Sequence, residues 1–262
     1  MVKEGYPVMA DPTSPLLTLI IPAYNEERRL PKSLDQIAAF VQQQPEDMEV
    51  IIVENGSADR TTEIAEGYAA EHPFVRVLHS PKGKGAAVRA GMNEGRGRYL
   101  FICDSDLSMP IDEVRKFLPP ILEDYDVAIA SREGPGAHRY GEPAYRHLMG
   151  RVFNFIVRVL AVPGFQDTQC GFKSFRDKVG KEVFADLTMT GWVFDVEALF
   201  IAQRRGYRVV AVPIDWYFDA DSRIEPLRDT WRMFRDVLRI RVNGWRGVYD
   251  RRTGRRVDKE AA

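Results

Sequence analysis

The sequence has little of what marks a disulfide-rich or zinc-binding protein. Its two cysteines, Cys103 and Cys170, lie far apart inside patterned segments, and its four histidines do not have the spacing of a zinc site. This cysteine usage is typical of reduced thiols and a cytosolic setting. We therefore expect neither a disulfide framework nor a structural zinc ion.

The sequence also lacks an excess of charge and a long apolar run. The formal net charge of -1 gives no support to a nucleic-acid partner. No stretch approaches the roughly 18 apolar residues that a membrane-spanning helix needs, and residues 1–15 lack the apolar core of a signal peptide. We expect residues 1–15 to form a flexible tail and residues 244–262 to form a basic C-terminal tail.

Short apolar segments alternate with helical patterns in the first half of the chain. Strands are predicted at residues 16–21, 49–53, 74–78, 98–103 and 126–130. Helices are predicted at residues 30–44, 59–71, 84–93 and 112–122. This alternation predicts an α/β fold with a mostly parallel sheet covered by helices on both faces.

The triplet Asp104-Ser105-Asp106 follows one of these apolar strands directly. Two carboxylates one residue apart raise each other's pKa, so an unpaired arrangement is unfavourable. Mg²⁺ bound to a diphosphate would relieve the repulsion, since it is held by one or two carboxylates and by phosphate oxygens. An ordinary polar turn is the alternative, because surface turns are rich in Asp and Ser.

Three further polar segments follow predicted strands. They are Pro22-Ala23-Tyr24-Asn25-Glu26, Glu54-Asn55-Gly56-Ser57 and Lys82-Gly83-Lys84-Gly85. Ligands of open parallel sheets bind beyond the carboxyl ends of the strands, so these segments and the acidic triplet are expected at one rim. Such a rim suits a nucleotide diphosphate with a metal ion, although any fold of this class has some polar loops there.

Together these motifs resemble the inverting family 2 glycosyltransferases with the GT-A fold. Two segments of the second half, Asp167-Thr168-Gln169-Cys170-Gly171-Phe172-Lys173 and Trp192-Val193-Phe194-Asp195-Val196-Glu197, look like the dolichyl-phosphate β-glucosyltransferases and their bacterial polyprenyl-phosphate relatives. The resemblance runs from about residue 16 to residue 241. It implies a single GT-A domain at residues 16–243, with a nucleotide-sugar part (16–132) and an acceptor and membrane-facing part (133–243).

The resemblance implies inverting transfer of a hexose, glucose from UDP-glucose, to a polyprenyl phosphate of the dolichyl type. Asp104 and Asp106 would hold a divalent metal, Mg²⁺ or Mn²⁺. The other residues that would bind the nucleotide sugar or the acceptor are Pro22, Tyr24, Asn25, Glu26, Glu54, Ser57, Lys84, Ser105, Trp192 and Glu197. The catalytic set would be Asp106, Asp167, Asp195, Arg132 and Arg223, with the two arginines on phosphates.

Each of these assignments in the second half has a plainer alternative. Asp167 could cap a turn, and Asp195 and Glu197 could complement the dipole of a helix that they open. Trp192 could belong to the core. Arg132 and Arg223 could be ordinary surface charges.

Two helical segments have one polar and one apolar face. In the first, a polar stripe (His147, Arg151, Asn154, Arg158) lies beside an apolar face formed by Leu148, Met149, Val152, Phe153, Phe155, Ile156, Val159 and Leu160. In the second, an apolar face (Leu227, Trp231, Phe234, Leu238) lies beside Arg228, Arg232, Arg235 and Arg239. Basic amphipathic helices of this kind bind membrane surfaces, which predicts a cytoplasmic protein peripherally attached to a membrane. Burial of both apolar faces in the core is the alternative.

Other functions remain open at this point. A mannosyl or other hexosyl donor is the nearest rival, because such relatives would share the metal rim. Nucleotidyl transfer is disfavoured, since a Gly-rich loop is not found after the first strand. A non-catalytic module that binds nucleotide sugars or membranes is a different class, and the sequence leaves a homo-oligomer open.

Overall fold

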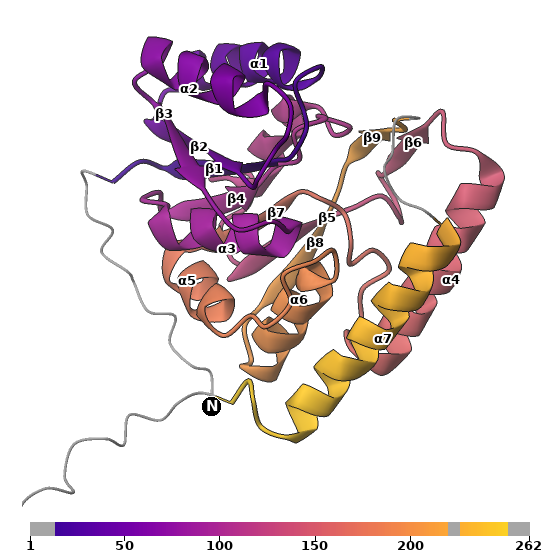
Figure 1. The fold of residues 1–262 in the computed structure, drawn as a ribbon. Helices are drawn as coiled ribbons and strands as arrows, with labels where there is room; N and C mark the ends of the chain where they lie inside the picture. Colours follow the sequence, from indigo (N-terminus) through magenta and orange to yellow (C-terminus); the bar gives the residue numbers. More distant parts are fainter. Residues whose placement is uncertain (1–13, 220–225, 251–262) are drawn as a thin grey trace, which may run out of the picture.

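A seven-stranded sheet forms the centre of the molecule (Figure 1). The computed structural model describes residues 14–219 and 226–250, and for residues 226–230 it describes the backbone only. The strands are β1 (Leu17–Ala23), β2 (Met48–Glu54), β3 (Val75–His79), β4 (Tyr99–Ile102), β5 (Val127–Ser131), β7 (Lys173–Arg176) and β8 (Val209–Pro213). Their order is β3-β2-β1-β4-β7-β5-β8. The predicted α/β class is confirmed.

The helices of the first half are α1 (Leu30–Gln42), α2 (Thr61–Glu71) and α3 (Lys84–Glu94), close to their predicted bounds. The prediction of a helix at residues 112–122 is wrong in type and length. A 3-10 helix, η1, spans Ile111–Phe117 instead. Pro119 and Pro120 explain the early end, because proline lacks a backbone N–H and forces the residue before it out of the helical conformation.

Strand β7 departs from the parallel pattern, since it runs antiparallel to both β4 and β5. Lys173, its first residue, is paired with Ile102 near the end of β4 and with Ile129 on β5. The start of β7 therefore lies at the same rim as the ends of its parallel neighbours. This direction brings the segment before Lys173 to the acidic triplet.

The second half adds β6 (His138–Tyr140), α4 (Ala144–Leu160), α5 (Asp177–Ala185), α6 (Phe194–Arg204), β9 (Asp215–Tyr217) and α7 (Pro226–Trp245). Strands β6 and β9 form a small separate sheet.

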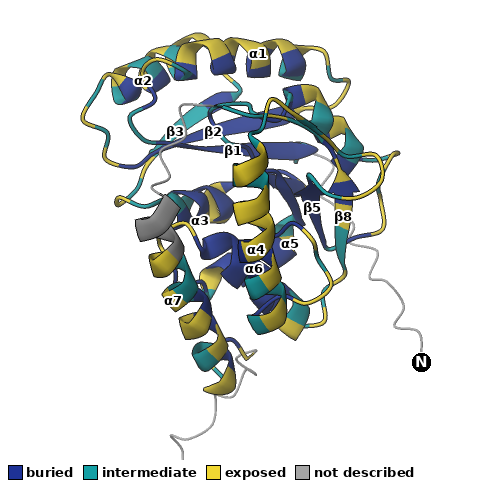
Figure 2. Cartoon of the chain, turned by 90° about the vertical axis from the view of Figure 1, so that its right-hand side faces the viewer, coloured by how far each residue is buried: buried dark blue, intermediate teal, exposed yellow. Residues whose placement is uncertain are grey.

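Two apolar cores cover the two faces of the sheet. Leu19 and Ile21 of β1 face a core built with α1 and η1, whereas Ile20 faces a core built with α3, α5 and α6. Figure 2 shows the buried strands between these helical layers. A sheet buried on both faces explains why its parallel strands are continuously apolar in sequence.

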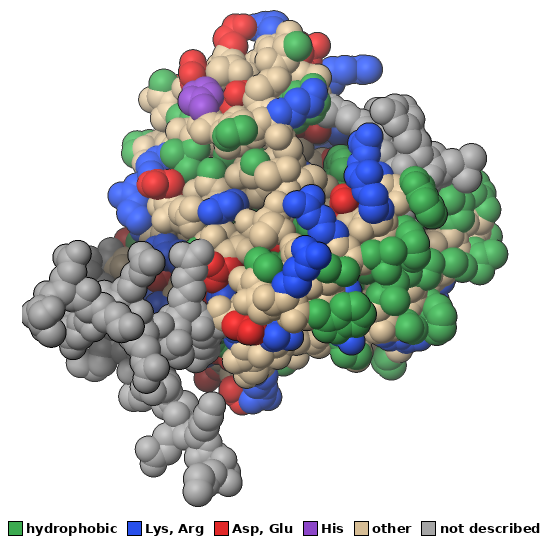
Figure 3. Space-filling view, turned by 60° about the horizontal axis from the view of Figure 1, so that its bottom comes forward, with side chains coloured by type: hydrophobic (Ala, Val, Ile, Leu, Met, Phe, Trp, Pro, Cys, Tyr) green, Lys and Arg blue, Asp and Glu red, His purple; other side chains and the backbone are tan. Residues whose placement is uncertain are grey.

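Helices α4 and α7 lie side by side at the edge of the molecule (Figure 1). Their exposed large apolar side chains are Tyr145, Leu148, Met149, Val152, Phe155 and Val159 on α4, and Trp231, Leu238 and Trp245 on α7. Figure 3 shows hydrophobic side chains gathered on this side of the molecule. No helix within the described ranges is both long and apolar enough to span a bilayer.

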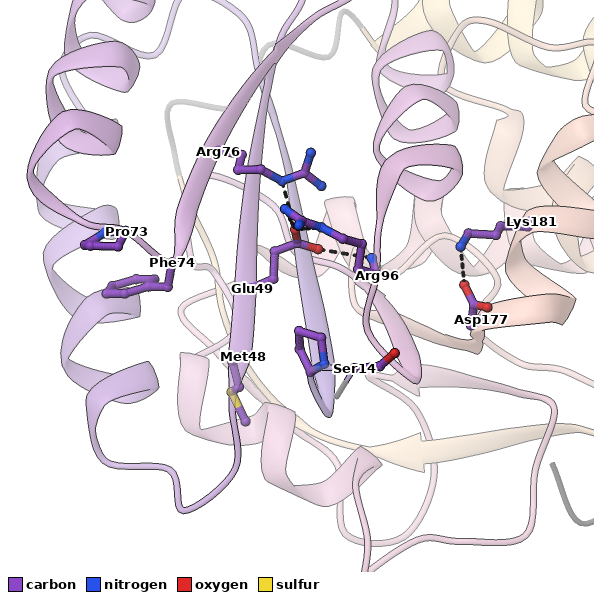
Figure 4. A pocket seen from close by; sticks show the side chains of 10 residues that line it. Ser14, Met48, Glu49, Pro73, Phe74, Arg76, Arg96, Asp177 and Lys181 are labelled. Carbon is purple, nitrogen blue, oxygen red and sulfur yellow. Dashed lines mark hydrogen bonds and ion pairs between the residues drawn. The ribbon is translucent and has the colours of Figure 1, made fainter. Parts of the chain in front are cut away.

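A cluster of charged side chains lies at the end of the sheet where β1 and β2 begin, which is opposite the end with the acidic triplet. A cavity of about 610 Å³ lies there, and Arg76 and Arg96 converge in it on Glu49 (Figure 4). Lys181 and Asp177, which are paired at 2.6 Å, line the same cavity.

The packed chain continues beyond the expected domain end at residue 243, which lies within α7. Tyr249 is fully buried in the core beside Phe200, and Arg204 is paired with Asp250 at 2.7 Å. The first part of the expected C-terminal tail therefore packs against α6.

Candidate active site

The acidic triplet lies immediately after β4, in a tight turn. The Ser108 amide donates to Asp106 Oδ1 at 2.9 Å, and Leu107 between them has a positive φ of 47°. Burial and the neighbouring charge of Asp104 raise the pKa of Asp106. A nearby cation would lower that pKa again, so the turn is suited to bind one.

Lys84 supplies a positive charge to this turn from the first residue of α3. Its ammonium lies 2.6 Å from Asp104 Oδ1 and 5.3 Å from the centre of the Trp192 ring. Burial lowers the pKa of Lys84, but the nearby carboxylates, chiefly Asp104 and Asp195, outweigh it and leave the pKa raised. The lysine is therefore charged and held at the rim.

The loops after β1 and β2 are joined by hydrogen bonds. The Asn25 amide donates to Ser57 Oγ at 3.0 Å, and the Ala58 amide donates to Asn25 Oδ1 at 2.8 Å. The Ser57 amide donates to Glu54 Oε1 at 2.5 Å. Burial raises the pKa of Glu54, but hydrogen bonds from the amide and hydroxyl of Ser57, the Gly56 amide and His79 outweigh it and leave the pKa lowered.

Glu26 and Tyr24 extend this joined pair of loops. The Glu26 amide donates to Thr61 Oγ1 at 2.7 Å, and Lys82 Nζ donates to the Tyr24 hydroxyl at 2.6 Å. Pro22 is a buried residue of β1 just before them. The first-half candidates thus form one continuous edge that leads through Lys82 to Lys84.

Sequence reasoning missed Arg29, which lies close to the acidic triplet. Its guanidinium binds Glu26 at 2.8 Å and Asp219 at 2.7 Å. Arg29, Lys32 and Asp106 line one cavity of about 350 Å³. The two arginines that follow Glu26-Glu27 in the sequence, Arg28 and Arg29, were the signal that could have identified it.

Arg132 and Asp167, predicted separately, form a buried ion pair. The guanidinium donates to both carboxylate oxygens, from Nε at 2.7 Å and from the second nitrogen at 2.9 Å, and the Arg132 amide adds a bond of 3.0 Å. Burial raises the pKa of Asp167, but the charge and hydrogen bonds of Arg132 outweigh it and bring the pKa to about 2. The Trp216 ring covers Arg132 at 5.3 Å.

Asp195 lies at the start of α6 and is almost fully buried. Its partner is Lys173, whose ammonium lies 2.9 Å from Asp195 Oδ1 and 2.5 Å from the Cys170 carbonyl oxygen. Burial raises the pKa of Asp195 despite this cation. The segment containing Lys173 carried the family resemblance, but the lysine itself was given no role.

Gly171 was also overlooked, and it touches the acidic triplet. A Cβ atom at this position would lie 1.9 Å from Asp104 Oδ2, so only glycine fits beside the carboxylate. The reversed direction of β7 brings this glycine to the rim.

The remaining candidates lie in different surroundings. Ser105 is buried within the triplet, and Trp192 is half-exposed above Lys84. Glu197 is fully buried and bonded to Thr188, Met189 and Tyr249. Arg223 lies outside the described residues. The substrate and catalytic roles of these residues stay predictions.

The carboxylate oxygens at the rim suit a divalent cation that is coordinated in part by its substrate. Asp104 and Asp106 offer hard carboxylate oxygens, which Mg²⁺ and Mn²⁺ accept in combination with phosphate oxygens. Within residues 14–219 and 226–250, three or more His, Cys, Asp or Glu side chains do not gather into a metal cluster. This pair would therefore need a diphosphate to complete the coordination.

The sheet with its acidic rim has the arrangement of the GT-A fold. Glucosyl-3-phosphoglycerate synthase from Mycobacterium tuberculosis, crystallised with Mn²⁺, UDP and phosphoglyceric acid, superimposes with a TM-score of 0.62. It is 18% identical in sequence, and the match covers 88% of this chain and 78% of that one. The expected GT-A fold is confirmed.

The sequence profile of Glycosyl transferase family 2 matches residues 18–184, and the chain belongs to that family. A dolichyl-phosphate beta-glucosyltransferase of Drosophila melanogaster is 35% identical over an alignment of 265 positions that covers 92% of this chain and 80% of the relative. One from Homo sapiens is 30% identical over an alignment of 263 positions that covers 94% of this chain and 81% of the relative. The resemblance seen in the sequence is confirmed, and the protein is a glycosyltransferase.

Proposed function

We propose that this protein transfers glucose from UDP-glucose to a dolichyl-type polyprenyl phosphate, with inversion, on the cytoplasmic face of a membrane. Relatives that match more than nine-tenths of the chain are named dolichyl-phosphate beta-glucosyltransferases. The observation in the molecule that carries the proposal is the row of exposed apolar side chains on α4, a helix that is bound to the charged segment Arg132-Glu133 after β5. A lipid phosphate needs both features, an apolar surface for its chain and cations for its head.

The donor diphosphate would bind at the rim formed by Asp104, Asp106 and Lys84. Mg²⁺ or Mn²⁺ held by the two carboxylates would act as a Lewis acid that offsets charge on the departing diphosphate. Lys84 and Lys82 bring further positive charge to the same place. The joined loops with Tyr24, Asn25 and Glu54 would bind the nucleoside.

The acceptor phosphate oxygen would form the new bond to the anomeric carbon as the bond to the nucleotide diphosphate breaks. This oxygen is anionic at neutral pH, so a strong general base is unnecessary. A carboxylate could still orient the acceptor phosphate or accept a residual proton from it, and we assign this role to Asp195 rather than to Asp167. Both oxygens of Asp167 are occupied by Arg132, and a group with a pKa of about 2 is a weak base.

The orientation of α4 supports contact with a lipid surface. Two residues of its polar stripe, His147 and Arg151, bind Glu133 at 3.0 Å, and a third, Asn154, is buried and accepts a bond from the Thr168 amide at 3.3 Å. Phe153 and Val157 pack in the core, whereas Leu148, which is 66% exposed, and Val159, which is 65% exposed, face solvent. Apolar side chains that stay solvent-exposed on a helix packed in this way favour an apolar partner.

Helix α7 extends this surface. Trp231 is 70% exposed and stacks on Phe234, and Arg235 and Arg239 are exposed beside them. Tryptophan with arginine is typical of helices that lie in the headgroup layer. Together α4 and α7 would place the rim next to the phosphate of a membrane-bound acceptor.

A donor panel tests the reaction. The protein is incubated with Mn²⁺ or Mg²⁺, a short polyprenyl phosphate and each of several nucleotide sugars, and the lipid products are weighed by mass spectrometry. We expect a hexosyl product with UDP-glucose and little with GDP-mannose. Absence of glycolipid with every donor would contradict the proposal, and a preference for GDP-mannose would correct the sugar.

Flotation with anionic liposomes tests the surface separately. We expect the wild-type protein to float and the double variant Leu148→Ser, Phe155→Ser to remain in the dense fraction. The variant Lys116→Ser, which alters a partly exposed side chain on η1, serves as the control and should float. If the double variant floats as well as the wild type, α4 is not the membrane contact.

A further inference from the structure

Glu197 is a buried carboxylate to which the proposed reaction gives no chemical step. It lies on α6 and has no exposed surface. Its oxygens accept hydrogen bonds from the Thr188 amide at 3.0 Å, the Thr188 hydroxyl at 2.5 Å, the Met189 amide at 2.7 Å and the Tyr249 hydroxyl at 2.7 Å. These hydrogen bonds anchor the two segments that carry the donors, which are the loop of residues 188–192 and the turn after α7.

The loop that Glu197 anchors is packed against the first turn of α3. The Thr190 carbonyl oxygen accepts hydrogen bonds from the Gly85 amide at 2.9 Å and the Ala86 amide at 3.4 Å. A Cβ atom on Gly83 would lie 2.4 Å from that same oxygen, and one on Gly85 would lie 2.7 Å from the Met189 carbonyl oxygen. Because no side chain fits between the two backbones, the position of the loop fixes the position of this turn.

The turn held in this way carries Lys84. Its ammonium lies 2.6 Å from Asp104 and beneath Trp192, which belongs to the same loop. A continuous series of contacts thus leads from Glu197 through Thr190 and Gly85 to Lys84 and Asp104. Displacing the loop would displace the lysine from the acidic triplet.

The other end of this series lies at α7. Tyr249, in the turn after the helix, is fully buried, and Asn243 near the end of α7 donates to its hydroxyl at 3.2 Å. The same helix exposes Trp231 and Trp245 on the proposed membrane surface. The turn that follows the helix that would contact lipid therefore contributes the hydroxyl that completes the Glu197 anchor.

We infer that Glu197 is a positioning residue for the Lys84–Asp104 pair, and that Tyr249 is the contact through which α7 holds it there. This inference rests on the proposed function for the statement that Lys84 and Asp104 bind the donor diphosphate. The physical link itself, from Tyr249 to the first turn of α3, does not depend on the identity of the substrate.

Amide hydrogen exchange measured by mass spectrometry tests the link directly. The variants are Tyr249→Phe, which removes one hydroxyl, and Glu197→Gln, which keeps the size of the side chain. We expect exchange to rise about fivefold in peptides covering residues 83–88 and 188–192, the change that loss of one hydrogen bond produces. Exchange in the peptide covering β4 should stay unchanged, because a general loss of stability would raise it everywhere.

Tyr207→Phe is the matched control. The Tyr207 hydroxyl donates to Glu182 at 2.5 Å, a tyrosine–glutamate bond like that of Tyr249 but on the surface between α5 and the segment after α6. We expect this variant to leave exchange at residues 83–88 at the wild-type level. If it raises exchange there as much as Tyr249→Phe does, the effect is not specific and the inference is wrong.

Calorimetric binding of UDP in the presence of Mn²⁺ then tests the consequence. We expect Tyr249→Phe to weaken binding about fivefold and Tyr207→Phe to leave it unchanged. Wild-type exchange and affinity in the folded Tyr249→Phe variant would overturn the inference whether or not Glu197→Gln folds. If the wild-type protein binds no UDP while exchange still rises in Tyr249→Phe, the proposed function fails and the link stands.

Discussion

Carboxylates with little solvent exposure lie at both ends of the central sheet, in opposite surroundings. At the end where β2 begins, Glu49 accepts hydrogen bonds from the Thr18 hydroxyl at 2.8 Å, Arg76 at 2.8 Å and Arg96 at 2.9 Å. At the other end, Asp104 and Asp106 are separated by one residue and lie near one partly buried lysine, Lys84. The first end gathers donors around one charge, whereas the second gathers charges of the same sign.

The pKa directions follow this difference. Burial raises the pKa of Glu49, but the bonds from Thr18, Arg96 and Arg76 outweigh it and leave the pKa lowered. Burial and the charge of Asp104 raise the pKa of Asp106. A carboxylate whose pKa is lowered stabilises the fold at neutral pH, whereas a carboxylate whose pKa is raised reduces the stability of the fold there. The negative charge of the second kind is available to a cationic ligand.

Asp106→Asn gives the largest expected effect. Loss of one of the two carboxylates proposed to bind the metal should reduce glucosyl transfer roughly 1000-fold, because the charge on the departing diphosphate would no longer be offset. With a chelator present, the same variant should be slightly more stable than wild type at neutral pH, since the like-charge repulsion is gone. Product is measured by mass spectrometry and stability by urea unfolding. Retained turnover would mean that the metal binds elsewhere.

Gly171→Ala probes the same end without changing any charge. The added Cβ would meet Asp104 Oδ2 at 1.9 Å and displace the carboxylate, so transfer should fall about 100-fold, the usual cost of a misplacement of about 1 Å. Gly67→Ala is the control, because no atom lies within 4 Å of its Cβ position in α2. Equal rates in the two variants would show that the contact of Gly171 with Asp104 is unimportant.

Glu49→Gln tests the opposite end, and here the effect should fall on stability. We expect a loss of about 2 kcal/mol in the free energy of unfolding and unchanged transfer, because charged hydrogen bonds to Arg76 and Arg96 are lost far from the rim. The folded pKa of Glu49 is below its ordinary value of 4.5, so its stabilisation is complete above that value and is lost as pH falls through the folded pKa.

The difference in unfolding free energy between wild type and Glu49→Gln should therefore shrink on going from about pH 7 to about pH 3. Urea unfolding at several pH values measures it. A difference that stays constant with pH would mean that the charge of Glu49 does not contribute.

Lys181→Ala should give the smallest effect. Its pair with Asp177 lines the same cavity as Glu49, but both side chains are partly exposed. Such pairs contribute about 0.5 kcal/mol or less, and transfer should be unchanged. A loss as large as that of Glu49→Gln would show that the cavity depends on all of its charges.

The rim of the first half could be predicted because one rule governs it. In parallel strands the carboxyl ends meet at one edge, so the segments with Asn25, Ser57, Lys84 and Asp104 had to converge there. The contributions of β7 could not be predicted in the same way. Lys173-Ser174-Phe175-Arg176 has charged ends, and nothing in so short a segment tells that it runs antiparallel or that Lys173 is fully buried.

The orientation of α4 is a second case. Periodicity predicted two faces, but it could not decide which face would turn toward the protein, because that depends on Glu133 and Thr168 from distant segments. Glu197 is a third case. Its place at the start of a helix suggested a dipole or a ligand, whereas the hydroxyl of Tyr249, far along the chain, determines its surroundings.

The position of β7 between β4 and β5 has a consequence for how the enzyme is made. Both carboxylates of the acidic triplet leave the ribosome well before Gly171, Lys173 and Asp195, which complete their surroundings. A fragment that ends between β5 and β7 would contain the Asp-x-Asp signature. It would lack β7, which pairs with β4 beside the signature, and Asp195, the carboxylate assigned to the acceptor. We expect such a fragment to be inactive however well it folds, because Gly171 and Asp195 are missing from it, so activity would begin only once α6 has been synthesised.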